Sequence, residues 1–308
     1  MTLTLEREAR QRLLLLALTI GVASALLAML QVLDGSQIGL YFYDFTNVGR
    51  GVGFFANANH FGAFEYMLLP LGVATLAETR ARSPAFVVLT VGCIAPALMF
   101  ALALTGSRSA IILGSLSAVA TLVFVLAPER SIIGPRRAVA LAAVFVLTLL
   151  PVAIGLGLLQ ILSRFAEQSV VDDARWRISA SAWAGLWSYF PVGAGIGTFE
   201  SVYPLHERVT DLVWQRVNRA HNDALETLFE GGGLSLVLLL AFVGWLVNST
   251  YCALVRQDAV QGRHARAGAI ALWLLLVHSL WDYPLRTVAL ETLFSLSWLC
   301  NSIRPALE

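Results

Sequence analysis

The sequence contains no lysine and few charged residues of any kind. All 21 basic residues are arginine, and charged residues occupy 13% of the 308 positions, against roughly 25% in soluble domains. Apolar residues make up 57%, and the mean hydropathy is +0.72. A soluble fold needs more polar surface than this, whereas a bilayer accepts apolar side chains on the outside of helices. The composition therefore predicts an integral membrane protein.

Several kinds of site are also missing. The net charge of +1 comes without a basic cluster, so we expect no nucleic-acid partner. The three cysteines, Cys93, Cys252 and Cys300, stand in apolar runs at spacings that suit neither a disulfide framework nor a metal site. No His-x-x-x-His motif or cluster of aspartates gives metal-ligand spacing. We therefore expect no metal and no other cofactor.

Apolar windows of about 20 residues, the length that crosses a hydrocarbon core of roughly 30 Å, occur repeatedly. They lie near 13–33, 57–78, 85–105, 109–126, 138–159, 233–255, 267–283 and 287–302. The first follows three arginines as a signal sequence does, but its length and the lack of a small-residue cleavage site favour a retained helix. The expected fold class is all-α: a polytopic membrane helical bundle with about eight transmembrane helices, forming a single membrane domain over 1–308.

Arginines in the connections predict the orientation, because cytoplasmic loops carry the excess of positive charge. Alternate connections hold Arg7, Arg10, Arg12, Arg80, Arg82, Arg130, Arg136, Arg137, Arg256, Arg263, Arg266 and Arg304. The short loops between them hold one apiece, Arg50, Arg108 and Arg286. We therefore expect a cytoplasmic N-terminus and an outer location for the long connection 160–231.

The 160–231 connection is the sizeable polar part of the sequence. Aromatic residues recur through it from Trp176 to Trp214, which is typical of segments at a membrane interface. We expect short amphipathic helices along the outer surface, joined by a tight loop at the glycine-rich run 191–197. That run lies in no strand–turn–helix unit, so it does not predict nucleotide binding.

His221 is the strongest candidate for proton transfer, because imidazole accepts a proton near neutral pH. Asn222 and Glu226 follow it one turn apart on an expected short helix, Glu230 comes one turn later, and the glycines 231–233 are expected to break that helix. We expect Asn222 and Glu230 to bind substrate beside the histidine. The alternative is a histidine that is merely solvated in a loop.

Outer arginines are candidates for binding phosphate. Arg108 lies in a very short loop near the predicted membrane boundary, where ionisable groups often mark a substrate path; the alternative is a side chain that reaches lipid phosphate. Residues 105–107 are placed to open the following helix, whose amides attract anions. Arg175 and Arg177 flank Trp176, and we expect one of them to bind phosphate while the other pairs with a nearby aspartate; the alternative for each is a purely structural ion pair.

Two further polar groups lie at predicted outer helix ends. His278 and Asp282 are four residues apart on one helical face, placed to orient the candidate base or to bind substrate; a structural hydrogen bond is the alternative. Arg50 precedes Asn59 and His60, whose side chains are suited to sugar hydroxyls. Helix capping by an asparagine is the alternative there.

Taken in order, these pieces resemble the superfamily of O-antigen ligases and of O-antigen and exopolysaccharide polymerases. The matching pieces cover about residues 48–290 and are RGVGFFANANH at 50–60, TGSRS at 105–109, the Arg-Trp segment at 175–187 with PVGAGIGTF at 191–199, AHNDALE at 220–226 with EGG at 230–232, and HSLWDYPL at 278–285.

The resemblance implies a metal-independent, inverting glycosyltransferase at the periplasmic face of the bacterial inner membrane. Its donor is a glycan on undecaprenyl diphosphate, and its acceptor is lipid A core or a nascent polysaccharide. Carried onto this chain, Arg108 and Arg177, or Arg175, hold the diphosphate while His221 takes the acceptor proton. Members of this superfamily usually have about a dozen spans, so this chain is expected to be a short member, a copy truncated at its start, or an inactive one.

The main rival interpretation is a transporter or flippase of polysaccharide precursors, because polar groups inside helical bundles also serve solute passage. It predicts ionisable residues near mid-span and inverted repeats. The embedded carboxylates Glu65 and Glu291 lie within a few turns of the predicted outer ends, and no repeat is visible in the sequence. These features favour the transferase.

Overall fold

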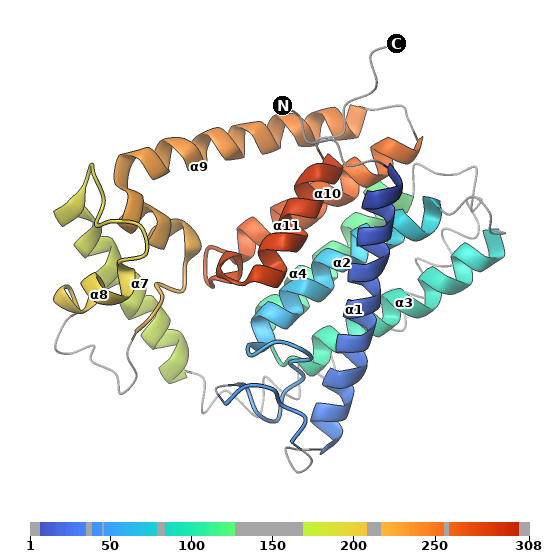
Figure 1. Ribbon diagram of the computed structural model, residues 1–308, viewed down its shortest axis with the longest axis horizontal. Helices are drawn as coiled ribbons and strands as arrows, with labels where there is room; N and C mark the ends of the chain where they lie inside the picture. The colour runs from blue at the N-terminus through green and yellow to red at the C-terminus, as the bar shows by residue number, and fades with distance from the viewer. Residues whose placement is uncertain are drawn as a thin grey trace. The chain divides into compact units, whose positions relative to one another are not determined.

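The computed structural model describes residues 7–34, 39–44, 46–78, 84–126, 169–207, 217–255 and 259–301. Within these ranges all regular structure is helical (Figure 1), which confirms the all-α fold class. The chain divides into two compact units. Unit 1 comprises Met1–Gln160, Ser249–Leu275 and Val288–Glu308, and unit 2 comprises Ile161–Asn248 and Leu276–Thr287. The prediction of a single membrane domain stays a prediction.

Unit 1 is built around helix α2. Its helices are α1 (Arg7–Asp34), α2 (Ala58–Glu78), α3 (Pro84–Leu104), α4 (Arg108–Ala120) with the π-helix η1 (Thr121–Leu126), most of α10 (Ala259–His278) and α11 (Val288–Asn301). Helix α2 packs against α1, α3, α4 and α11, and nearly all of its side chains are buried, as expected of a helix that is apolar all round. A Cβ atom on Gly62 of α2 would lie 2.4 Å from that of Ala110, so this glycine permits close contact with α4.

Three described helices are long and apolar enough to cross a membrane: Arg7–Asp34, Arg108–Val125 and Asp223–Val255. The predicted windows on α2, α3, α10 and α11 also coincide with helices. The window 138–159 lies outside the described residues. The protein is therefore a helical membrane protein, and the number of eight spans stays a prediction. The window 267–283 overruns its helix, which ends at His278 and is followed by a turn.

Unit 2 contains α7 (Ser169–Tyr189), α8 (Phe199–Val202), the 3₁₀ turns η2 (Tyr203–Leu205) and η4 (Pro284–Arg286), and the first part of α9 (Asp223–Val255). One face of α7 packs on an aromatic core that includes Phe199, Tyr203 and Phe229. The opposite face exposes Trp176 and two more tryptophans. Helix α7 is thus amphipathic, as predicted, although at 21 residues it is longer than a short helix.

Helix α9 bends where the triple glycine was predicted to break it, and the bend is visible in the orange ribbon (Figure 1). Gly232 has φ 56° and ψ −140°, a conformation that only glycine adopts readily. A Cβ on Gly232 would lie 2.3 Å from the Pro191 oxygen, and one on Gly193 would lie 2.3 Å from the Glu230 oxygen. Two glycines therefore allow backbone contact between the bend and the predicted loop 191–197.

Candidate active site

The polar site of unit 2 forms where α9 begins. Asn222 caps the helix, since its Oδ1 accepts the Leu225 N–H at 2.9 Å. Its Nδ2 donates to the Leu280 oxygen at 2.8 Å, and the Asp223 N–H donates to the Ser279 oxygen at 2.9 Å. These bonds join the start of α9 to the turn after α10. The short helix predicted before the glycines is therefore the first part of α9, which continues through the bend at Gly232.

His221 lies immediately before this cap in a strained backbone conformation. Its φ is 51°, in the left-handed region that non-glycine residues seldom occupy and that concentrates at functional sites. The bonds of Asn222 and Asp223 to the neighbouring turn hold the backbone on its C-terminal side. The His221 side chain is 23% exposed, so solvent reaches a ring whose position is fixed by its surroundings.

A buried carboxylate lies between two imidazoles. His221 Nδ1 is 3.8 Å from Asp282 Oδ1, and His278 Nε2 is 4.0 Å from Asp282 Oδ2. The Tyr283 ring contacts His221 edge to face, with centroids 5.1 Å apart. The His278–Asp282 pair therefore lies against His221, as one of the two sequence interpretations expected. Both distances exceed a hydrogen bond but suit attraction between Asp282 and a protonated imidazole.

Three acidic residues on one face of α9 contact arginines. Glu226 accepts the Arg219 Nη1–H at 2.8 Å and the Ala220 N–H at 2.9 Å. Arg286 lies 3.8 Å from Asp223, 3.3 Å from Glu226 and 3.5 Å from Glu230. These carboxylates are buried, and such groups are stable only when paired. The arginines therefore hold the ends of the loop before α9 and of the turn after α10 together.

Glu230, which was predicted to bind substrate, has contacts within the protein at both oxygens. Its Oε1 accepts the Phe199 N–H at 3.1 Å, at the start of α8, and its Oε2 faces Arg286. Its backbone oxygen accepts the Gly195 N–H at 2.9 Å. These contacts connect α9 to the loop 191–197 and give Glu230 a clear structural role. The Asn222 amide is engaged in the same way, by the helix cap and by Leu280.

Helix α7, which carries the two predicted arginines, contacts the loop before α9. Ser179 donates to the Ala220 oxygen at 3.3 Å, and Ile178 packs in the cluster that contains Ala220. Arg175 lies three and four residues before these positions, which places it one turn away on the same helical face. Arg177 lies off this face. Of the two, Arg175 lies on the face of α7 that contacts the loop before α9.

The remaining predicted residues belong to unit 1. Ser107 caps α4 by accepting the Ala110 N–H at 3.2 Å, so Arg108 is the first residue of that helix, as expected, and it is exposed. The Gly51 N–H donates to the Leu104 oxygen at 2.9 Å, which joins the Arg50 loop to the turn before α4. The Asn57 side chain caps α2, which leaves Asn59 and His60 in its first turn.

Arg50, Asn59, His60 and Arg108 therefore gather at one end of unit 1, where the starts of α2 and α4 meet. His221, Asn222, Glu230, His278, Asp282, Arg175 and Arg177 belong to unit 2. Within unit 2, Asp282 lies 3.8 Å from His221 and 4.0 Å from His278, so the three side chains form one cluster.

Arg219 and Arg286 are prominent in the structure but were not predicted as site residues. Arg286 was counted only as an ordinary outer arginine. A signal for it exists, because residues 223, 226 and 230 share one helical face and buried acids require cationic partners. Sequence alone does not say which of the outer arginines pairs with them, since Arg286 is 56 residues from Glu230.

Comparison with known proteins agrees with the resemblance seen in the sequence. No curated protein and no solved structure matches the chain. The family model described as O-antigen ligase matches residues 91–240, just under half of the chain. The matched segment contains Arg108, Arg175, Arg177 and His221. Residues 91–240 are thus similar to the O-antigen ligase family, which supports the resemblance to the superfamily of O-antigen ligases and polysaccharide polymerases.

Proposed function

We propose that this protein transfers a glycan from an undecaprenyl-diphosphate donor to a sugar hydroxyl, with His221 as the general base. The match of residues 91–240 to the O-antigen ligase family supports glycosyl transfer from lipid-linked polysaccharide in a membrane. The observation that carries the proposal is the position of Asp282, with one oxygen 3.8 Å from His221 Nδ1. The proposed site lies on the periplasmic face of the inner membrane, as the arginine distribution predicts.

In the proposed reaction, the acceptor hydroxyl attacks the anomeric carbon as its proton passes to His221 Nε2. The new C–O bond forms while the bond to the diphosphate breaks, and the diphosphate leaves with the electron pair. One displacement of this kind inverts the anomeric centre. Asp282 faces Nδ1, so its negative charge stabilises the imidazolium as it forms. His278, on the other side of Asp282, limits the movement of that carboxylate.

The leaving diphosphate needs fixed positive charge. We assign this role to Arg108 in unit 1 and to Arg175 in unit 2, with Arg177 as the alternative to Arg175. Arg108 stands beside the first amides of α4, which add the favourable field of a helix N-terminus. The proposal therefore requires the guanidinium groups of Arg108 and Arg175 to approach one diphosphate during the reaction. The acceptor is lipid A core or a growing polysaccharide.

The test uses purified protein in detergent with a labelled undecaprenyl-diphosphate glycan, candidate acceptors and a chelator. The expected result is transfer by the wild type, loss of at least about 100-fold in His221→Ala, and a smaller loss in Arg108→Ala. His206→Ala is the matched control, because His206 lies in the same unit and bonds to Tyr189 at 2.8 Å instead of facing Asp282. Full activity in His221→Ala would exclude the proposed base. Turnover that requires added divalent metal would exclude the metal-independent mechanism.

A further inference from the structure

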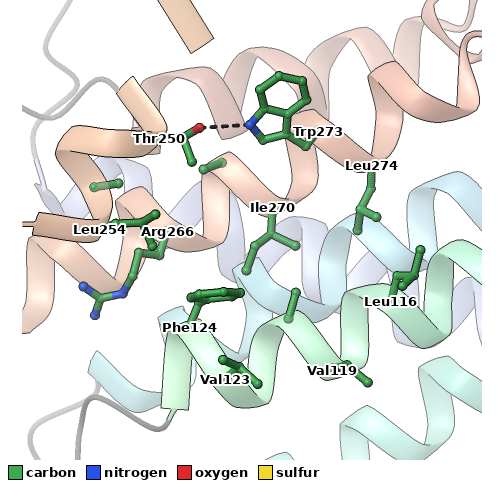
Figure 2. Close-up of a pocket in the computed structure, with 13 residues that line it drawn as sticks. Leu116, Val119, Val123, Phe124, Thr250, Leu254, Arg266, Ile270, Trp273 and Leu274 are labelled. Atoms are coloured by element: carbon green, nitrogen blue, oxygen red, sulfur yellow. Dashed lines mark hydrogen bonds between the residues drawn. The ribbon is translucent and has the colours of Figure 1, made fainter. Parts of the chain in front are cut away.

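A cavity in unit 1 has the features of a lipid site. It has a volume of about 370 Å³ and lies between α4 with η1, the end of α9, and α10. Figure 2 shows apolar side chains along it, with Arg266 at one end of the row and Leu116 and Leu274 at the other. Apart from Arg266 and Thr250, the side chains that line the cavity are apolar, or, for Trp273, largely so. Trp273 donates to Thr250 Oγ1 at 3.0 Å, which keeps that polar pair satisfied.

The rim of the cavity is exposed. Leu116, Val119, Val123, Phe124 and Leu254 are all among the exposed large hydrophobic side chains. In a helical membrane protein such side chains face hydrocarbon. From Leu116 to Phe124 the helix rises about 12 Å at 1.5 Å per residue, so the cavity extends along the helix as an acyl chain does in a leaflet.

Positive charge gathers at the Arg266 end. Glu78 pairs with Arg7, and its Oε2 lies 3.3 Å from His264 Nε2. These contacts bring the start of α1, the end of α2 and the start of α10 together. The same helices carry further buried arginines, Arg10, Arg263 and Arg266, within one turn of these contacts.

We propose that this cavity binds an anionic phospholipid, with an acyl chain along α4 and α10 and the phosphate at Arg266. Basic pockets between transmembrane helices on the cytoplasmic side are suited to anionic headgroups, and the arginine distribution predicts that this end of the bundle is cytoplasmic. Arg266 lines the cavity and also belongs to the group of buried arginines at its end. The inference concerns unit 1 and is independent of the glycosyl transfer proposed above.

The test uses the full-length protein in nanodiscs with phosphatidylglycerol that carries a photoreactive acyl chain. After irradiation, peptide mapping is expected to find label on segments 116–126, 250–254 and 266–274. Unlabelled phosphatidylglycerol should compete, and phosphatidylethanolamine should compete at least several-fold less well. Label confined to other helices would overturn the proposal. Absence of label from these three segments would also overturn it, since it would mean that another part of the chain fills the cavity. Equal competition by the two lipids would overturn the role of the headgroup.

Two variants locate the site. Arg266→Gln should reduce labelling about fivefold, since one basic residue near anionic lipid is worth about that factor. Arg12→Gln, on an exposed arginine, is its control. Ala120→Trp fills the cavity without changing a buried charge and should also reduce labelling, whereas Ile112→Trp on the exposed face of α4 should not. Gel filtration checks that each variant is folded, and wild-type labelling in folded Ala120→Trp would contradict the proposal.

Discussion

The Asp282 carboxylate offers the sharpest test of how His221 works. Replacement by asparagine removes the negative charge but keeps an Oδ1 that accepts the Tyr283 N–H, as Asp282 does at 2.9 Å. The local turn should therefore survive. At 3.8 Å, the attraction between a carboxylate and an imidazolium is about 4 kcal/mol for an effective dielectric constant of about 20. The asparagine dipole and water replace part of it, so we expect a net loss of about 2.7 kcal/mol, or about 100-fold in rate.

The loss should fall on kcat, because the imidazolium exists only as the proton moves. KM for the lipid-linked donor should change little. The assay is initial-rate glycan transfer by wild type and Asp282→Asn at several donor concentrations. Glu200→Gln, at an exposed carboxylate of α8, is the matched control. Because Asp282 acts through His221, adding Asp282→Asn to His221→Ala should cost nothing further. Wild-type kcat in Asp282→Asn, or a full further loss in the double variant, would refute this reasoning.

Three other outcomes are expected. Arg286→Gln should lower the free energy of unfolding by about 3 kcal/mol, since three buried carboxylates lose the cation that they share; thermal melting in detergent checks this, and a shift no larger than that of Arg12→Gln would contradict it. Gly193→Ala should lower the melting temperature more than Gly197→Ala, because both glycines have positive φ but only the first would place a Cβ against backbone, with open space at the second; equal shifts would show that the close contact carries no cost. A reporter fused at position 200 should report the outer side of the membrane, and a cytoplasmic signal would reverse the predicted topology.

Local signals in the sequence predicted much of the architecture. The apolar windows coincide with α1, α2, α3, α4 and α11. Apolar composition and sufficient length are enough to predict a helix that is buried in lipid or in a bundle. The cap at Ser107, the bend at Gly232 and the pairing of His278 with Asp282 depend on residues within one turn of each other. For that reason they were readable without a structure.

Features that depend on distant contacts were not readable in this way. The contact that joins the first turn of α9 to the turn after α10, from Asn222 to Leu280, spans 58 residues and gives no local signal. The left-handed backbone of His221 depends on the turn after α10, more than 50 residues away. The pairing of Arg286 with the acidic residues of α9 was missed for the same reason, since Arg286 is 56 residues from Glu230. The approach of Arg108 to the residues of unit 2 stays a prediction.

The bend in α9 divides the helix into two parts with different structural roles. Residues before Gly232 hold carboxylates in fixed positions, and residues after it form an apolar segment that must match the thickness of its host bilayer. Since the contact between Gly193 and Gly232 is made by main-chain atoms, it imposes no side-chain requirement on the lipid-facing surface. Substitutions that adapt residues 234–255 to a thicker or thinner bilayer can therefore accumulate while the geometry around the histidine is conserved.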